Sequence, residues 1–462
     1  MPETAAGPPA EALGVRRPPL DRFGLAELGR IVVVCAVLGG GLLRAWLRWA
    51  LGRHGGRTRA EALSDGAIDA FGRLGPMFVK LGQLMASSPG LFPYPLSEAA
   101  GRCLDDMPPF PAARARRLVA EELGRPVSEL FAEFDDAPLA SASIAQVHAC
   151  VLPDGRPAVL KVQRPGIGRR MIVDLRIMYR LAHRLDGRVE LVRLISLAGI
   201  VEQLYEVTCQ ELNFALEARN QERFGGAVAA FGDNEHVTVP EVHWRYCSPR
   251  VICMQRLYGT PLDRPAELAA RGVDGGLALR RGVKAWLEAA AVHGPFHGDA
   301  HAGNIWVLDD GRLAFLDFGI MGELAPCWRA LLRDALYTTV FDRDFERVAR
   351  GLRDLGVLDP EVGTDAQLGL ALRTVFGPLL DVPLARLDTR KIIDMLLSTA
   401  RQFSGENPPE LTLFAKQLIY FERYSRALAP GWVLSADPFV LRNIFPADAA
   451  ARAAELGVPM PD

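Results

Sequence analysis

Residues 297–319 read HGDAHAGNIWVLDDGRLAFLDFG and contain two short apolar runs, one on either side of Asp310-Gly311. Asp-Gly favours a two-residue type I′ turn, so the two runs are predicted to form a β-hairpin. Pairing outward from that turn sets Asn304 opposite Asp317, with their Cβ atoms roughly 5 Å apart. An amide and a carboxylate are oxygen ligands that suit Mg²⁺, which completes its shell with water and phosphate oxygens. The hairpin therefore predicts a magnesium site formed by Asn304 and Asp317.

Asp299 lies five residues before Asn304. This is the catalytic-loop spacing of protein kinases, in which the Asp is the base and the Asn is a metal ligand. Asp317-Phe318-Gly319 then occupies the metal-binding Asp-Phe-Gly position of those enzymes. A surface hairpin with incidental polar residues is the alternative, because Asp-x-Gly is also an ordinary turn. Three polar positions at the right offsets favour a phosphoryl-transfer site with Asp299 as its catalytic residue.

The composition is that of a globular chain with balanced charge. The 462 residues are 49% hydrophobic and 23% charged, with a net charge of −2. The length predicts two or three domains or one large two-lobed one. The charge balance gives no indication of nucleic-acid binding, and the oligomeric state is left open. The seven cysteines are scattered without a Cys-x-x-Cys pair, so we expect a reducing, cytoplasmic compartment and no structural zinc.

Residues 1–58 are predicted to be a disordered, basic segment, since they are rich in Pro, Ala and Gly as far as Leu20. The uncharged run Ile31 to Leu43 is too short to span a bilayer. Arginines interleaved with tryptophans follow over residues 44–53. This pattern suits a helix lying on an anionic membrane surface, which here means the inner face of the membrane. A helix docked on the protein's own core is an equally good interpretation.

Residues 59–135 are predicted to form a helical extension. Apolar residues follow a helical period from Glu61 to Ser88, but Lys80 and Gln83 interrupt it on one face. A solvated stripe on a surface helix is the alternative. A buried lysine requires a carboxylate partner, and Glu211 is the best candidate. We expect these three residues to be regulatory. The helix that carries Lys80 and Gln83 is expected to fold over the nucleotide cleft and to exclude peptides.

Residues 136–258 are predicted to form a nucleotide-binding lobe. A small-residue loop has the spacing of a kinase Gly-x-Gly-x-x-Gly loop with alanine replacing each glycine, so it should hold phosphates but be stiffer. Its phosphate-binding residues are Ala140, Ser141, Ala142, Ser143 and Ala145. A second hairpin, turning at Asp154-Gly155, joins Ala145–Leu152 to Pro157–Val162. Lys161 lies near its end, where kinases place the lysine that holds the α- and β-phosphates.

Two further nucleotide contacts are predicted in this lobe. Kinase-like chemistry requires an acidic partner for Lys161, and Glu217 is the first choice and Glu211 the second, both on a helix expected from Leu197 to Phe231. A strand from Arg250 to Met254 leads into a hinge expected to contact adenine. The adenine-contacting residues are Met254, Gln255 and Leu257.

The chain resembles the UbiB/AarF family of atypical protein-kinase-like proteins. Four motifs carry the resemblance, namely Lys80-Leu81-Gly82-Gln83, Ser143 to His148, Lys161 to Gly166, and His297 to Gly319. The resemblance implies an α+β, two-lobed protein-kinase-like fold with an N-terminal helical extension and a mostly helical C-lobe over residues 259–462. It also implies ATP or ADP and Mg²⁺ as cofactors. The implied partners are an isoprenoid lipid or quinone precursor, most often in quinone biosynthesis, and it places the Lys-x-Gly-Gln helix across the site.

The sequence departs from the family pattern at a few positions. Asn213 replaces the Asp of a Glu-x-Asp motif, so it is expected to offer Lys80 a hydrogen bond but no charge. Ala300 and Ala302 replace two prolines around Asp299.

Conventional protein kinases have parts that this chain lacks. Only six residues separate Gly319 from a helix predicted to begin near Pro326, and no Ala-Pro-Glu occurs there. Gly298 stands where those kinases carry an Arg that senses phosphorylation. The sequence therefore predicts an ATPase or a small-molecule or lipid kinase. A conventional protein Ser/Thr kinase and a non-catalytic nucleotide-sensing scaffold remain the alternatives.

Overall fold

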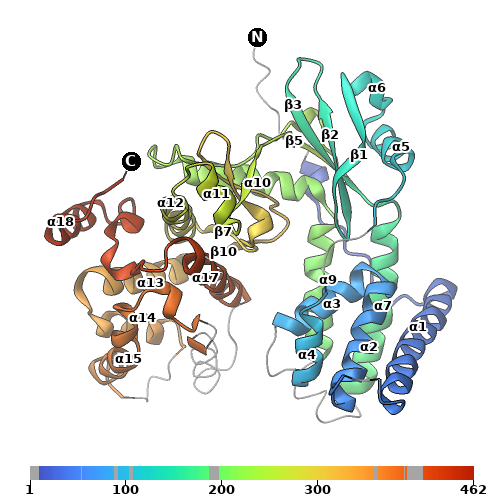
Figure 1. The fold of residues 1–462 in the computed structure, drawn as a ribbon, viewed down its shortest axis with the longest axis horizontal. Helices are drawn as coiled ribbons and strands as arrows, with labels where there is room; N and C mark the ends of the chain where they lie inside the picture. Colours follow the sequence, from blue (N-terminus) through green and yellow to red (C-terminus); the bar gives the residue numbers. More distant parts are fainter. Residues whose placement is uncertain are drawn as a thin grey trace. The chain divides into compact units, whose positions relative to one another are not determined.

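The computed structural model describes residues 10–53, 55–87, 92–103, 108–186, 197–357, 363–389, 391–392 and 409–461. The chain forms two compact units (Figure 1). Unit 1 is Met1–Leu216 with His243–Gln255, and unit 2 is Glu217–Val242 with Arg256–Asp462. The domain boundaries predicted at residues 58, 135 and 258 stay predictions.

Unit 1 contains an antiparallel sheet of four strands in the order β1-β2-β3-β5 (Figure 1). The strands are β1 (Glu133–Ser141), β2 (Ala145–Val151), β3 (Pro157–Gln163) and β5 (Val251–Gln255). One face of the sheet shares a buried core with α5 (Ala112–Leu123) and α6 (Val127–Leu130). The predicted hairpin from Ala145 to Val162 is confirmed.

The rest of unit 1 is helical, and its helices are shorter than the sequence predicted. The expected helix from Glu61 to Ser88 is two helices, because Gly75 adopts a φ of 108° and Pro76 follows it. The expected helix from Leu197 to Phe231 also breaks, at Asn213, whose side-chain oxygen accepts from the N–H of Ala215 at 3.1 Å. These helices are α2 (Arg59–Leu74), α3 (Pro76–Ser87), α4 (Tyr94–Ala100), α7 (Ile167–Asp186), α9 (Leu197–Glu211) and α10 (Phe214–Ala229), which belongs to unit 2 from Glu217 onward.

The disorder predicted for the N-terminal segment is wrong from Ala10 onward. The described residues begin with the short η1 (Ala10–Leu13), and Val15 and Leu20 pack against the core formed by α7 and α9. The Tyr205 hydroxyl donates to the carbonyl of Pro18 at 2.7 Å. The prediction considered only composition and could not count contacts with helices more than 150 residues away. Residues 1–9 lie outside the described part of the chain.

Helix α1 (Leu25–Ala50) combines the two alternatives raised for the N-terminal region. One face docks on unit 1: Gly41 approaches the backbone of Gly66 so closely that a Cβ would lie 2.7 Å from a carbonyl oxygen, and Arg30 pairs with Asp174 at 2.7 Å. The opposite face is exposed and apolar, as with Leu28, Val32 and Leu43. The uncharged run from Ile31 to Leu43 is by itself too short for a bilayer, but the helix that contains it extends well beyond that run. The helix has 26 residues, and an 18-residue window of it has a mean hydropathy of 1.8, so by length and composition alone it could cross a membrane.

Unit 2 is mostly helical in its described residues, as expected, and contains two small sheets. One has the order β4-β9-β8-β6 and the other pairs β10 with β7. Its core surrounds the fully buried Trp286. The strands are β4 (Val237–Thr238), β6 (Gly259–Pro261), β7 (Pro295–His297), β8 (Ile305–Leu308), β9 (Leu313–Phe315) and β10 (Met321–Glu323). The principal helices are α11 (Pro265–Ala270), α12 (Gly275–Glu288), α13 (Pro326–Tyr337), α14 (Phe345–Asp354), α15 (Asp365–Leu380), α17 (Pro409–Leu428) and α18 (Pro446–Leu456).

The β8–β9 hairpin forms as predicted, but its register is shifted by one residue. Val307 pairs with Leu313, and the N–H of Leu308 donates to the carbonyl of Arg312 at 2.7 Å, so the turn contains three residues. A type I′ turn requires positive φ at both central residues, whereas here Gly311 alone has it, at 87°. Asn304 therefore faces Leu316, whose N–H donates to the Asn304 carbonyl at 2.8 Å. The predicted direct opposition of Asn304 and Asp317 is wrong.

Candidate active site

The loop that carries Asp299 is fixed by hydrogen bonds from side chains of unit 2. The indole N–H of Trp286 donates to the carbonyl of His297 at 2.9 Å. Gln417 on α17 accepts from the N–H of Ala300 at 2.8 Å and donates to the carbonyl of Gly298 at 2.6 Å. These bonds hold the backbone on both sides of Asp299, so the position of its carboxylate is determined by α12 and α17.

His297 links the Asp299 loop to the Asp-Phe-Gly segment. It is fully buried, its Nε2 faces the carbonyls of Leu316 and Asp317, each at 2.9 Å, and its Nδ1 accepts from the N–H of Asp299 at 3.2 Å. These partners require the neutral Nε2–H tautomer. Burial lowers the pKa of His297, which keeps the ring neutral. The two halves of the candidate site are therefore joined by an uncharged ring.

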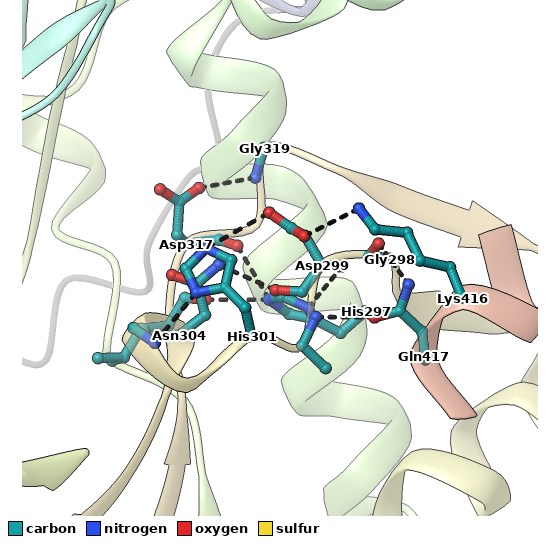
Figure 2. Close-up of polar contacts among 12 residues, drawn as sticks. His297, Gly298, Asp299, His301, Asn304, Asp317, Gly319, Lys416 and Gln417 are labelled. Carbon is teal, nitrogen blue, oxygen red and sulfur yellow. Dashed lines mark hydrogen bonds and ion pairs between the residues drawn. The ribbon is translucent and has the colours of Figure 1, made fainter. Parts of the chain in front are cut away.

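The carboxylate of Asp299 lies between two basic side chains (Figure 2). Lys416 Nζ is 3.3 Å from Oδ1, and His301 Nε2 is 3.5 Å from Oδ2. The side-chain amide of Asn304 donates to the Asp299 carbonyl at 3.0 Å. Asp299 and Asn304 are therefore brought together, as the sequence predicted.

Asp317 reaches the site through an unusual backbone conformation. Its φ is 54°, and it is one of only two non-glycine residues with positive φ among those described. The side-chain Oδ1 accepts from the N–H of Gly319 at 3.2 Å. Phe318 anchors the segment, since it is fully buried and its ring centroid lies 5.0 Å from that of His297 and 5.6 Å from that of Phe224. Asp317 thus reaches the site through a left-handed backbone conformation just beyond β9. Contrary to the sequence prediction, it does not lie directly opposite Asn304.

Asn304 and Asp317 fit a magnesium ion by the chemistry of their donors. The side-chain nitrogen of Asn304 donates to the Asp299 carbonyl, so the side-chain oxygen of Asn304 is the atom that could bind a metal. That oxygen and the Asp317 carboxylate are the hard ligands that Mg²⁺ prefers, and Mg²⁺ takes its remaining ligands from water and phosphate. No group of three or more His, Cys, Asp or Glu suited to a metal occurs in the described residues. Phosphate oxygens of a bound nucleotide would therefore complete the coordination shell of a metal held by the two predicted ligands.

In unit 1, the Ala-rich loop between β1 and β2 is held by Arg164. Its guanidinium donates to the Ala142 carbonyl and the Ser141 hydroxyl, each at 2.8 Å, and to the Pro108 carbonyl at 3.0 Å. No residue of this described loop has a positive φ. The conformation is therefore one that alanine adopts without strain, which agrees with a loop stiffer than a glycine-rich one. Ser143 is buried within it, whereas Ala140 lies in β1 and Ala145 in β2.

Lys161 lies inside β3, where it pairs with Val147 on one side and Ile252 on the other. It is 7% exposed, and its Nζ lies 5.3 Å from the centre of the Phe214 ring. Glu217 is 5% exposed on α10 in unit 2, and its predicted pairing with Lys161 stays a prediction.

The residues predicted to contact adenine lie where the chain leaves the sheet of unit 1. Met254 and Gln255 end β5, and Leu257 follows just after the chain enters unit 2. Their adenine contacts also stay a prediction.

The Lys-x-Gly-Gln motif lies on α3, and its lysine forms an ion pair with Glu211 on α9 as the sequence led us to expect. Both side chains are largely buried. Gly82 is required by packing, because a Cβ there would lie 2.2 Å from the sulfur of Cys103. Gln83 is half-buried on the same helix.

Asn213 does not serve Lys80 in the way the sequence predicted. Its side-chain amide donates to the carbonyls of Ala12 and Gly14, at 2.9 and 3.3 Å. The residue therefore tethers the N-terminal segment, a use that no local sequence pattern could show.

The sequence matches the ABC1 atypical kinase-like domain over residues 102–352 and the UbiB helical domain over residues 372–433. It is 34% identical over 377 residues to the probable protein kinase UbiB of Marinobacter nauticus, with 80% of this chain and 68% of the relative covered. It is 38% identical over 371 residues to the uncharacterized protein Rv0647c of Mycobacterium tuberculosis, with 80% and 75% covered. The chain belongs to the UbiB/AarF family.

The UbiB/AarF assignment agrees with a solved structure. The chain is similar to Rv3197 of Mycobacterium tuberculosis, solved in complex with erythromycin, with a TM-score of 0.53 and 25% identity over 82% of this chain and 94% of that one. The predicted kinase-like α+β fold is confirmed. UbiB/AarF membership also confirms an atypical kinase-like protein in general terms.

The sequence interpretation missed three site residues, and each was hidden for its own reason. Arg164 was quoted within the Lys161 motif but given no role, although its charge next to a phosphate loop was a usable signal. Lys416 and Gln417 lie more than 100 residues after Asp299 in a helix without a recognisable motif. In this UbiB/AarF chain they belong to the region matched by the UbiB helical domain.

Proposed function

We propose that this UbiB/AarF protein binds Mg²⁺-ATP and either hydrolyses it or transfers its γ-phosphoryl group to a small molecule or lipid. The observation that carries the proposal is the gathering of Asp299, Asn304 and Asp317 on a rigid loop and hairpin of unit 2 (Figure 2). Asp299 is exposed enough to accept a proton, with 24% of its side chain accessible. Asn304 and Asp317 would supply two oxygen ligands for the metal that phosphoryl transfer requires.

The proposed steps assign a role to residues within each unit. Asp299 orients the attacking hydroxyl or water and accepts its proton. Asn304 and Asp317 would hold Mg²⁺, which neutralises charge on the β- and γ-phosphates. In unit 1, Lys161 and the N–H groups of the Ala-rich loop would bind phosphate. Met254 and Gln255 at the end of β5, and Leu257 beyond it, would bind adenine.

The structure of unit 2 favours a small-molecule acceptor over a peptide. Protein kinases grip peptide with the segment after Asp-Phe-Gly. Here Met321–Glu323 of that segment is already paired with β7 in the sheet. Gly298 has no room for the Arg of those kinases, because even a Cβ would lie 2.8 Å from Leu413 and 3.0 Å from Ile320.

We further propose an anionic membrane surface as a partner and an isoprenoid lipid or quinone precursor as the acceptor. The exposed apolar face of α1 supports the first part, and the C-terminal part of the same helix carries Arg44 and Arg48, both exposed. The second follows from what the resemblance to the UbiB/AarF family implies. The protein would then be cytoplasmic and peripheral at the inner face of the membrane. In the same proposal, Lys80, Gln83 and Glu211 are regulatory.

The experiment is nucleotide binding with and without Mg²⁺, followed by turnover. Asp317→Asn removes a charged ligand but tolerates positive φ as Asp does, so the fold should survive. We expect the Mg²⁺-dependent thermal shift with ATP to be lost in this variant. The matched control is Asp310→Asn, which removes a carboxylate from the exposed turn of the same hairpin. Equal Mg²⁺-dependent shifts in Asp317→Asn and the wild type would contradict the metal site.

A further inference from the structure

Helix α17 places a lysine directly beside the proposed catalytic base. Lys416 Nζ lies 3.3 Å from Asp299 Oδ1 (Figure 2). The neighbouring Gln417 bonds the backbone of Gly298 and Ala300, and the hydroxyl of Tyr424 donates to the Ala300 carbonyl at 2.9 Å. Three side chains of one helix thus contact one short loop, so the approach of Lys416 to Asp299 is built into the packing.

The charge on Lys416 persists although only 37% of its side chain is accessible. Burial opposes the ammonium form, but the carboxylate of Asp299 and the hydrogen bond between them offset it, and the pKa of Lys416 is raised above its ordinary value. The ammonium also lies 5.6 Å from the centre of the Tyr420 ring. Asp299 is the acidic partner that contacts it.

Lys284, a buried lysine elsewhere in unit 2, shows the surroundings of a structural ion pair. Lys284 is 2% exposed and is enclosed by Glu288 at 2.9 Å, Asn234 at 2.7 Å and Asp233 at 3.3 Å. Lys416, in contrast, has 37% of its side chain accessible, next to Asp299, of which 24% is accessible. Its surroundings are those of a functional cation, not of a core salt bridge.

The catalytic loop itself supplies no permanent cation. Residues 297–304 contain neither Lys nor Arg. Phosphoryl transfer develops negative charge on the equatorial oxygens of the transferred group, and a positioned cation stabilises it. Such a charge must therefore come from another element, and α17 brings one to Asp299.

We infer that Lys416 is a catalytic residue whose ammonium contacts the γ-phosphoryl group during transfer, while Asp299 accepts the proton of the attacking oxygen. The inference rests on the proposed function. An attacking oxygen held by Asp299 lies about 2.6–3.2 Å from the carboxylate, and its phosphorus about 3–3.5 Å beyond. A flexible lysine stem covers that distance without backbone movement. Without nucleotide, the ammonium rests on Asp299.

The reaction balances without any further reactant. The bond between the γ-phosphorus and the bridging oxygen breaks, and its electron pair leaves with ADP. A new bond forms from the oxygen of water or an acceptor hydroxyl, whose proton moves to Asp299. Lys416 forms no bond and gives up no proton; it stabilises charge.

The test compares Lys416→Met, Lys416→Arg and the wild type in steady-state turnover and in binding of ATP and ADP. Met keeps the apolar stem that packs in α17 and removes the charge. We expect Lys416→Met to lower kcat by about 10²–10³-fold, as when one charge-stabilising donor is removed. ADP affinity should be unchanged, because ADP lacks the γ-phosphate, and Arg should restore part of the rate. The control is Lys391→Ala, an exposed lysine of unit 2 paired with Asp388.

The outcomes separate the inference from the function on which it rests. A Lys416→Met variant that turns over ATP within a few-fold of the wild type overturns the inference and leaves the function standing. So does an equal loss of ATP and ADP affinity with a lowered melting temperature, which would make Lys416 structural. A wild-type protein with neither turnover nor Mg²⁺-dependent ATP binding overturns the proposed function, and the inference with it.

Discussion

At the scale of single residues, the two Asp-Gly turns show what a local motif can and cannot predict. Asp154 and Asp310 each accept from the backbone N–H and the guanidinium of an Arg two residues later. These bonds to Arg156 and Arg312 also lower the pKa of both carboxylates. Each turn contains three residues instead of the two predicted, and only its glycine has a positive φ. The hairpins were predictable from sequence, but their register was not.

His148 in β2 gives a prediction about pH. Its Nδ1 donates to the carbonyl of Asp135 at 2.9 Å, so Nε2 faces Gln146 as an acceptor and the ring is neutral. Burial lowers its pKa, although the bond to Asp135 partly opposes this. Between the folded pKa and the unfolded value of about 6.5, the unfolded chain binds more protons. The stabilisation of the folded state that comes from the lowered pKa of His148 is complete above about pH 6.5 and is lost as the pH falls toward the folded pKa.

The measurement is the melting temperature above and below about pH 6.5 for the wild type and for His148→Gln, which does not titrate. We expect a smaller loss on acidification in the variant. The other histidines are common to both proteins, so the difference belongs to His148. Identical pH dependence would contradict the argument.

At the scale of elements, helix content was predictable and helix ends were not. The break at Gly75-Pro76 could have been read from the two residue types, which stop helices for known reasons. The break at Asn213 could not, because this residue is set by contacts with the N-terminal segment. Charge and small-residue patterns found the Ala-rich loop and Lys161, but the clamp by Arg164 depends on folding.

Asn213→Asp separates the two roles of this residue. A carboxylate still accepts from the N–H of Ala215 and caps α10, but it cannot donate to Ala12 and Gly14. We expect faster hydrogen exchange over residues 10–20 with α10 unchanged, and a stability loss of about 1–3 kcal/mol. Asn213→Ala is the comparison, because it should loosen α10 as well. Unchanged exchange over residues 10–20 in Asn213→Asp would show that the tether lies elsewhere.

The Lys80–Glu211 pair gives a prediction about regulation. Lys80→Ala should raise nucleotide turnover if the pair restrains the enzyme. It should also cost about 3–5 kcal/mol, because Glu211 would be left as an unpaired, largely buried charge. The double variant Lys80→Ala/Glu211→Gln removes that charge, so it should keep the raised turnover and recover stability. If turnover rises in neither variant, the Lys80–Glu211 pair is a purely structural contact.

At the scale of the whole molecule, the sequence was informative where function depends on neighbours in the chain. Asp299, Asn304 and Asp317 lie within 19 residues, and their kinase-like spacing identified them. Lys416 and Asp299 are 117 residues apart, and Asn213 and Ala12 are 201 apart. A single sequence contains no record of such pairings. Family resemblance supplied the fold, while the long-range contacts required the structure.

The proposed membrane attachment concerns the whole chain and is tested with vesicles. Val32→Asp combined with Leu43→Asp places charge on the exposed face of α1 without touching its packed face. We expect the wild type to float with vesicles containing anionic phosphatidylglycerol, less strongly at high salt, and the double variant to remain in solution. Leu370→Asp is the control, an exposed leucine of α15 in unit 2. Equal flotation of the double variant and wild type would exclude α1 as the anchor.

The contact between Gly82 and Cys103 makes the Lys-x-Gly-Gln helix chemically addressable. The sulfur of Cys103 occupies the space that a side chain at Gly82 would need, and the residue is half-buried. An alkylated thiol cannot fit against α3, so a maleimide can react stably only when the helix has moved away. The labelling rate of Cys103, followed on the peptide that contains it, therefore reports any movement of α3 away from this residue. Comparing that rate with and without nucleotide would test whether nucleotide moves the helix, with no mutation in the motif itself.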